Sequence, residues 1–354
     1  MKKFSKDDKW LLTSCLQKSV RKGFADLARH YASELYELER SHLLYHLSII
    51  ALEDIGLGNL PVVHEFMQTQ IRKTNIDEKG GKNYILSVVN NFALSVKDRS
   101  AHELTELANF HSNPLDADDA HLKALFLNDE KPIVNRMIAG WEILGAQKLK
   151  NPMVMNKIDD LDKFVEINQK IVSSSQVIDI MKDAYLIHRE PHFIALGLLS
   201  YLFEKEKGKK IGKYETGTFV EKKYQPELID STWLIDAIDW TTREGKLAIH
   251  EFCKEPVETV KYLKTHNVAS DDLLEQAIGL LFARYSGNQV DKRLAYPSAV
   301  VILKLNEKTA FHKLLDNNKI DHQHAFGLFE KDYPVLKKKI EELFKLPNPK
   351  YFPF

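Results

Sequence analysis

Apolar residues recur every three or four positions along most of the chain, which is the spacing of the buried face of an amphipathic helix. Gly23 and Gly56 stand at predicted helix ends, and Pro132 and Pro191 stand at predicted helix starts. The pattern predicts helices over residues 5–23, 25–38, 43–56, 59–67, 84–96, 101–110, 117–127, 132–149, 158–171, 176–187 and 193–203, and again from about 231 to 344 with pauses near 287 and 297. We therefore expect an all-α protein, a multi-helix bundle.

Residues 204–227 interrupt this pattern, because they are rich in lysine and glycine and carry no helical stripe. They predict a long loop or a small hairpin around residues 211–220. This segment is also the expected boundary between an N-terminal helical domain, residues 1–203, and a C-terminal helical domain, residues 230–354, with residues 204–229 as a basic linker.

Two adjacent carboxylates, Glu53 and Asp54, end the helix that stops at Gly56. At 100° per residue Asp54 shares the apolar face of that helix, so its carboxylate is predicted to point toward the core. A buried carboxylate needs a partner, and the backbone amides at the start of the Pro61 helix, or a basic residue such as Arg21 or Arg40, would supply one. We favour a structural role, in which Asp54 fixes the packing of neighbouring helices, over a role in binding or coupling.

The same region carries an alternative chemistry in Glu39, His42 and His46, which fall on one helical stripe. The Glu-x-x-His spacing occurs in bundles that bind two metal ions, but such bundles need a second copy of the motif. Asp118, three residues before His121, matches this motif only in part, with Asp in place of Glu. We expect no metal site and keep these residues as the alternative.

The charge balance excludes a protein that binds nucleic acid by overall electrostatics, since 50 Lys and Arg residues match 50 Asp and Glu residues. Any such binding must come from a local patch. The two cysteines, Cys15 and Cys253, are too few for a disulfide framework or a zinc knuckle, which indicates a reducing compartment.

Several segment types are missing from the sequence. The N-terminus has no apolar stretch typical of a signal peptide, and we expect no membrane span. The nearest approach to a phosphate-binding loop, residues 208–214, has the wrong glycine spacing and no hydroxyl after its lysine. These observations predict a cytoplasmic protein without a bound cofactor.

Two groups of residues could contact a phosphate or DNA. Asp239, Arg243, Lys246 and His250 would align on one face of an uninterrupted helix, as a phosphate site or as a solvated ion pair of Asp239 with Arg243. The lysines of residues 204–227, among them Lys209, Lys210 and Lys213, could contact backbone phosphates, although a solvated loop is the favoured interpretation.

Residues 16–59 resemble the C-terminal helical region of the RarA/MgsA replication-associated AAA+ ATPases, which are related to clamp loaders. The matching residues are Lys18-Ser19-Val20-Arg21, then Tyr31-Ala32, then Ala51-Leu52-Glu53-Asp54-Ile55-Gly56, with Leu52 where that family has Ser. The resemblance covers about an eighth of the chain and implies a collar-like helical module that assembles into oligomers. ATP hydrolysis is not implied, because the motor of that family lies upstream of this region.

Three functions follow as expectations. The first is a non-enzymatic interaction or oligomerisation protein of DNA replication, recombination or repair, which associates with itself or with replication proteins and contacts DNA secondarily. The second is a helical enzyme, either metal-dependent or acting on phosphorylated or nucleic-acid substrates. The third is an adaptor or inhibitor of a replication or defence complex.

Overall fold

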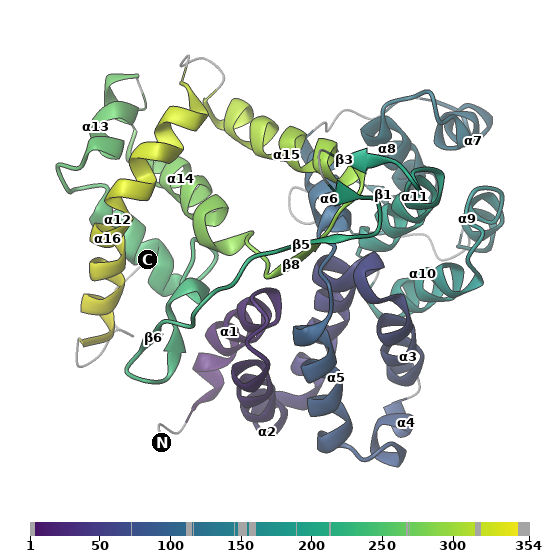
Figure 1. The fold of residues 1–354 in the computed structure, drawn as a ribbon, viewed down its shortest axis with the longest axis horizontal. Coiled ribbons are helices and arrows are strands. Elements are labelled where there is room, and N and C mark those ends of the chain that lie inside the picture. The colour runs from purple at the N-terminus through teal and green to yellow at the C-terminus, as the bar shows by residue number, and fades with distance from the viewer. Residues whose placement is uncertain are drawn as a thin grey trace.

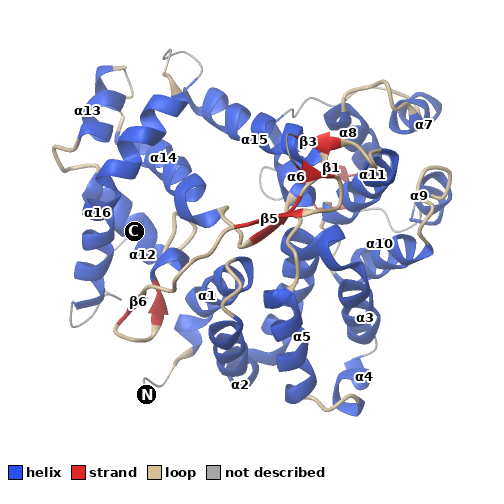
Figure 2. Ribbon diagram, in the orientation of Figure 1, coloured by secondary structure: helices blue, strands red, loops and turns tan. Residues whose placement is uncertain are grey.

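The predicted all-α fold is confirmed: 73% of the computed structural model is helix and 4% is strand (Figures 1 and 2). The structure describes residues 4–345 except 72, 111–114, 116, 145, 148–153, 156–160, 189, 212–213, 267, 269 and 316–319. The resemblance to a clamp-loader collar, and the division into domains at residues 204–229, stay predictions.

The helices of the first half of the chain are α1 (Lys9–Arg21), α2 (Ala25–Ile50), α3 (Leu60–Ile71), α4 (Lys73–Glu78), α5 (Lys82–Leu94), α6 (Ser100–Phe110), α7 (Asp119–Leu127), α8 (Ile133–Ile143) and α9 (Leu161–Asn168). Those of the second half are α10 (Ser175–Ile187), α11 (His192–Lys205), α12 (Arg243–Phe252), α13 (Glu258–Thr265), α14 (Asp271–Phe282), α15 (Pro297–Leu315) and α16 (His322–Lys345). Four two-stranded antiparallel ribbons pair β1 (Ala146–Gln147) with β2 (Val154–Met155), β3 (Lys210–Ile211) with β4 (Tyr214–Glu215), β5 (Phe219–Glu221) with β8 (Lys292–Leu294), and β6 (Leu228–Ile229) with β7 (Trp233–Leu234).

Local signals place the N-terminal helices as predicted. The side chains of Ser5 and Asp8 form a capping box before α1, and Gly23 ends that helix with a φ of +74°. The two helices expected on either side of residue 40 are joined in α2, which is kinked at Glu39, where the backbone is extended. A π-helical turn, Ala51–Ile55, continues α2 to Gly56.

Elsewhere two predicted boundaries are wrong, and one strand pairing was not predicted. Helix α8 ends at Ile143 rather than near residue 149, and β1 follows it. Helices resume at Arg243 rather than near residue 231, because residues 228–234 form the β6–β7 ribbon. The hairpin expected around residues 211–220 is present as β3–β4, but the next strand, β5, pairs with β8, some 70 residues further along the chain. No pattern within a short stretch of the sequence predicts such a pairing.

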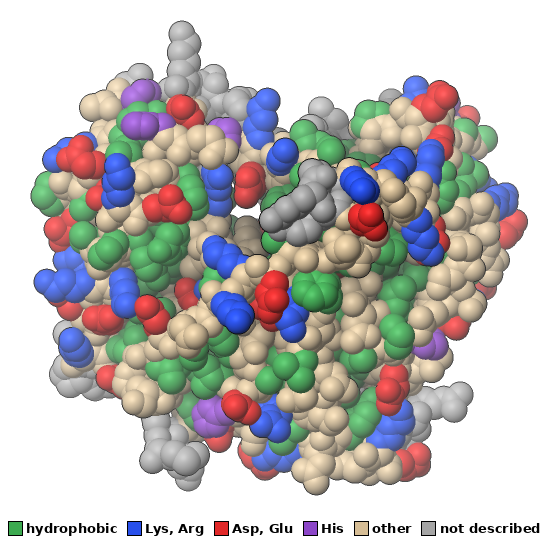
Figure 3. Space-filling view, viewed as in Figure 1, with side chains coloured by type: hydrophobic (Ala, Val, Ile, Leu, Met, Phe, Trp, Pro, Cys, Tyr) green, Lys and Arg blue, Asp and Glu red, His purple; other side chains and the backbone are tan. Residues whose placement is uncertain are grey.

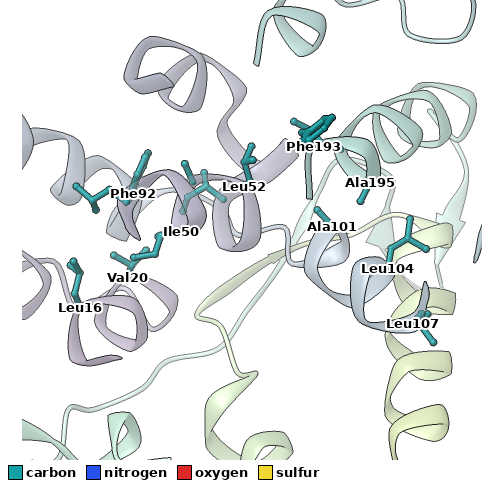
Figure 4. Close-up of a cluster of buried hydrophobic side chains, with 14 of the residues drawn as sticks. Leu16, Val20, Ile50, Leu52, Phe92, Ala101, Leu104, Leu107, Phe193 and Ala195 are labelled. Atoms are coloured by element: carbon teal, nitrogen blue, oxygen red, sulfur yellow. The ribbon is translucent and has the colours of Figure 1, made fainter. Parts of the chain in front are cut away.

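The hydrophobic core joins helices from both halves of the chain. Figure 4 shows side chains of α1, α5, α6 and α11 gathered around the end of α2, including Leu16, Ile50, Phe92, Leu104 and Phe193, each at most 1% exposed. Cys15 and Cys253 are free, buried thiols, and burial raises the pKa of each to about 12.

The expectation that the chain has no membrane span stays a prediction. The helical stretch Ala25–Ile71 is long and apolar enough by composition, and 56% of its most apolar part is buried inside the protein. A core helix and a membrane span share these properties, so the finding does not place the chain in a membrane.

Candidate functional site

Asp54 belongs to the π-helical turn that follows α2, two residues before the chain turns at Gly56. Gly56 has a φ of +46°, and a Cβ there would lie 3.0 Å from the carbonyl oxygen of Asp98. The amide of Asp98 donates to the carbonyl of Asp54 at 3.0 Å, which ties this turn to the start of α6. The Asp54 side chain is fully buried, as its place on the apolar face predicts.

Two guanidinium groups neutralise Asp54. Its Oδ1 accepts from Arg21 Nε at 2.6 Å and from Arg99 Nη1 at 2.5 Å, and its Oδ2 accepts from Gln17 at 3.0 Å. Arg21 Nη2 also donates to Glu53 at 2.8 Å. Arg21 is therefore the partner expected from the sequence, whereas Arg40 is not: it pairs with Asp77 at the surface.

His102 extends this network along α6. Its ring nitrogens lie 3.1 Å from Glu53 and 3.4 Å from Glu106. Burial acts to lower the pKa of His102, but the two carboxylates outweigh burial and raise it. Burial acts to raise the pKa of Glu106, yet His102 and a hydrogen bond from Asn306 bring it down to about 2. The two carboxylates therefore favour the protonated form of His102, and His102 favours the ionised form of Glu106.

Further buried or partly buried ion pairs connect α1, α6 and the segment before α6 to the C-terminal half. Lys18 of α1 contacts Asp239 at 2.9 Å, and Lys97 contacts Asp291 at 3.0 Å. Lys22 pairs with Asp236 at 2.5 Å, and Arg293 of β8 pairs with Glu103 of α6. The two halves of the chain are thus joined by charges as well as by the apolar core.

Arg21, Glu53, Arg99 and His102 of this network line a cleft of about 1860 Å³. We call this part of the lining the floor of the cleft and the other lining residues its walls. The walls carry Trp10, whose side chain is 62% exposed, and Trp240, which is 41% exposed. Lys9, Arg243 and Lys246 line the cleft with them. Large aromatic groups on an open, charged wall are typical of binding surfaces.

The helical stripe predicted from Asp239 to His250 is wrong. Helix α12 begins at Arg243, and Thr242 caps it by accepting a hydrogen bond from the Gly245 amide at 3.1 Å. Asp239 precedes the helix and pairs with Lys18, so the expected pair of Asp239 with Arg243 gives way to an interaction between distant segments.

The structure nevertheless brings three of those four residues to the cleft. Asp239, Arg243 and Lys246 line it, whereas His250 pairs with Glu275 at 2.7 Å and is not part of the lining. Their role in binding a phosphate or DNA stays a prediction.

The lysine-rich segment lies outside the cleft lining. Lys209 and Lys210 are exposed on the β3–β4 hairpin, and Lys210 lies 3.6 Å from Glu215. Lys213 is outside the described residues.

The alternative metal site is not assembled in the described part of the chain. Glu39 pairs with Lys9 at 3.0 Å, and His42 contacts the hydroxyl of Thr13 at 2.9 Å. The ring of His46 is tilted against that of His42, with ring centroids 4.3 Å apart. Asp118 caps α7. Among the residues that the structure describes, no three His, Cys, Asp or Glu side chains are placed to hold a metal ion.

Sequence reasoning missed the contribution of α6. Arg99, His102, Glu103 and Glu106 are spaced by three or four residues, which places them on adjoining parts of one helix surface. The apolar residues between them, such as Leu104, occupy the opposite face. This polar stripe resembles a solvated helix face, and only the fold shows that Arg99 contacts Asp54 and that His102 contacts Glu53.

Comparison of the chain with protein-family models, with curated proteins and with solved structures returned no match. The likeness of residues 16–59 to the RarA/MgsA region therefore stays a prediction that depends on those residues alone.

Proposed function

We propose that this chain is a non-enzymatic helical interaction and assembly protein of DNA replication, recombination or repair, and that it contacts DNA through the cleft. The observation that carries the DNA contact is the pair of exposed indoles, Trp10 and Trp240, beside Lys9, Arg243 and Lys246. The resemblance of residues 16–59 supports the replication context and the assembly.

The charges of the cleft favour stacking over electrostatic attraction as the source of affinity. Eight Lys and Arg residues and eight Asp and Glu residues line it, so it has no net charge apart from its histidines. Stacking of a base on an aromatic side chain contributes about 1–3 kcal/mol. Bases in a duplex already stack on one another, so the expected ligand is a single-stranded or unpaired segment. Its binding should depend weakly on salt, with a logarithmic slope of about −2 if three phosphates are contacted.

Tryptophan fluorescence tests the DNA contact directly. The chain has four tryptophans, of which Trp141 and Trp233 are at most 2% exposed. Quenching by oligodeoxythymidine of about 20 nucleotides, which is longer than a typical single-strand site, would therefore report on Trp10 and Trp240.

The matched variants are Trp10→Ala and Leu186→Ala, which removes a 63% exposed side chain outside the cleft lining. We expect Trp10→Ala to weaken binding about tenfold, within the range for one lost stack, and Leu186→Ala to leave it unchanged. Equal affinity of wild type and Trp10→Ala, or equal binding of duplex and single strand, would contradict the proposed contact.

Assembly is tested separately by light scattering over a range of concentrations. We expect a mass above 40.8 kDa that rises with concentration. A strict monomer that also fails to capture replication proteins would remove the assembly part of the proposal, whatever the result with DNA.

A second candidate function, an enzyme that acts on nucleic acid, is favoured by the position of His102. Its imidazole lies in the cleft lining between Glu53 and Glu106, and a protonated imidazole held by carboxylates is a suitable general acid. Cleavage of labelled single-stranded DNA that is lost in His102→Gln, with DNA binding retained, would favour this function over the first.

A further inference from the structure

The β5–β8 ribbon crosses the face shown in Figure 1. Within the described residues, one of its edges is bonded to another segment and the other edge is open. The antiparallel register of the ribbon pairs Val220 with Arg293. On the outer side of β8, the amide of Lys97 donates to the carbonyl of Lys292 at 2.7 Å, and the amide of Leu294 donates to the carbonyl of Lys97 at 2.8 Å. The edge of β8 is thus covered by the chain itself.

The hydrogen bonds of β5 show which of its backbone groups face outward. The amide of Lys222 donates to Asp291 at 2.6 Å, and the carbonyl of Thr218 accepts from Ala295 at 2.9 Å. Because the direction of these groups alternates along an antiparallel strand, Phe219 and Glu221 direct their N–H and C=O groups away from β8. No hydrogen bond to these groups from another described segment is present.

The side chains along this edge are also exposed. Phe219 is 43% exposed and Val220 is 39% exposed, which is unusual for apolar residues of a strand. Figure 3 shows apolar side chains next to basic and acidic ones near the centre of this face. An open edge with apolar side chains is the surface that accepts an added strand.

Exposed lysines stand at both ends of β5. Lys209 and Lys210 belong to the hairpin that precedes it, and the amide of Thr216 bonds to the carbonyl of Lys209 at that end. Lys222 and Lys223 follow it. Within the part of the chain that the structure describes, Lys209, Lys222 and Lys223 form no ion pair with a carboxylate.

We propose that the open edge of β5 binds an extended acidic segment of a partner protein by strand addition. Backbone hydrogen bonds to Phe219 and Glu221 would supply the affinity, and the flanking lysines would select acidic residues at both ends of the segment. A second copy of this chain fits less well, because it would bring its own lysines to the same edge. This interaction is independent of the cleft and of DNA binding.

Residue-resolved amide hydrogen exchange gives the most direct test. The probe is a soluble ten-residue peptide in which Asp or Glu alternates with Val or Ile, and the control peptide carries Lys in place of the acids. We expect the acidic peptide to slow exchange at Phe219 and Glu221, whose amides face outward, and the lysine peptide to have no effect.

Two pairs of variants distinguish the contribution of the backbone hydrogen bonds to binding from that of the lysine charges. Glu221→Pro removes one outward N–H without removing a bond to β8, and Glu221→Ala is its control because it keeps that N–H. We expect Glu221→Pro to weaken peptide binding about tenfold, while Glu221→Ala, which removes an acid from the edge, binds equally or more tightly. Lys222→Glu with Lys223→Glu should also weaken binding, whereas Lys331→Glu, on the exposed surface of α16, should not.

Four results would overturn the proposal: no binding of the acidic peptide, equal binding of the lysine peptide, equal affinities of the Pro and Ala variants, or protection confined to residues away from β5. A dimer that Glu221→Pro dissociates would assign the edge to a second copy instead. Binding of DNA that depends on Lys222 and Lys223, without protection of the Phe219 amide, would assign the lysines to nucleic acid.

Discussion

Replacement of Asp54 by Asn tests whether the central ion cluster holds the fold together. The substitution keeps the size of the side chain and removes its negative charge. The Asp54 carboxylate is fully buried and accepts hydrogen bonds from two guanidinium groups, at 2.6 Å from Arg21 and at 2.5 Å from Arg99. Without its charge, both guanidinium groups remain buried with Glu53 as their nearest carboxylate.

The expected loss follows from the general cost of leaving a buried charge unpaired, which is about 3–5 kcal/mol. Because Glu53 still contacts Arg21 at 2.8 Å, we expect the lower end of that range. The entropy of unfolding is about 2.1 cal/mol/K per residue, so 354 residues give about 0.7 kcal/mol/K. The midpoint of thermal unfolding should therefore fall by about 4 °C or somewhat more.

Calorimetry and urea unfolding of Asp54→Asn and Asp26→Asn measure this effect against a control. Asp26 pairs with Arg29 at 2.5 Å, but its side chain is 92% exposed, so the midpoint should stay within experimental error. The double variant Asp54→Asn, Arg99→Met should lose less stability than the sum of the two single variants, by about 1–3 kcal/mol. Equal small shifts in Asp54→Asn and Asp26→Asn would refute the structural role of the cluster.

Two further predictions concern a close backbone contact and a buried imidazole. A Cβ at Gly245 would lie 1.8 Å from the carbonyl oxygen of Asp239, so Gly245→Ala should destabilise the protein by about 3 kcal/mol. The control is Gly327→Ala, in open space on α16, which should stabilise the protein by about 0.5–1 kcal/mol. Urea unfolding measures both changes. Burial lowers the pKa of His188 to about 4, although the charge of Glu190 acts in the opposite direction. The contribution of His188 to the free energy of unfolding is therefore complete above about pH 6.5 and falls by up to about 3 kcal/mol toward pH 4. The loss of stability between pH 7 and pH 4.5 should be smaller in His188→Gln, and an identical pH dependence would contradict this account.

The sequence predicts those features of the fold that arise within one helix. The 3.6-residue period places Asp54 on the apolar face of its helix, and the structure buries it there. The glycine signals work in the same way: Gly23 and Gly56 end their helices with positive φ. At Gly245 the carbonyl of Asp239 occupies the space that a Cβ would need. Each of these properties depends on a few neighbouring residues.

The candidate site depends on contacts between distant residues, and these are not encoded in a local pattern. Lys18 and Asp239 are more than 200 residues apart in the chain, and Lys97 and Asp291 are nearly as distant. For Asp239 the local spacing suggested Arg243 as partner, because a continuous helix would bring the two together. Thr242 begins the helix after Asp239 instead, and the carboxylate turns to Lys18. For the same reason, the sequence did not predict the cleft.

The pairing of charges within the central ion cluster also indicates where a phosphate ligand would bind. Arg21 and Arg99 would be suitable phosphate ligands if they were free, but Glu53 and Asp54 already neutralise them. Buried charges that pair with one another hold helices in register, and separating them to admit a phosphate would carry the penalty that Asp54→Asn measures. The ligand is therefore expected at the walls, where Trp10 and Trp240 are exposed. If Trp10→Ala bound DNA normally while Asp54→Asn lost binding at an unchanged unfolding midpoint, the floor and not the walls would be the binding surface.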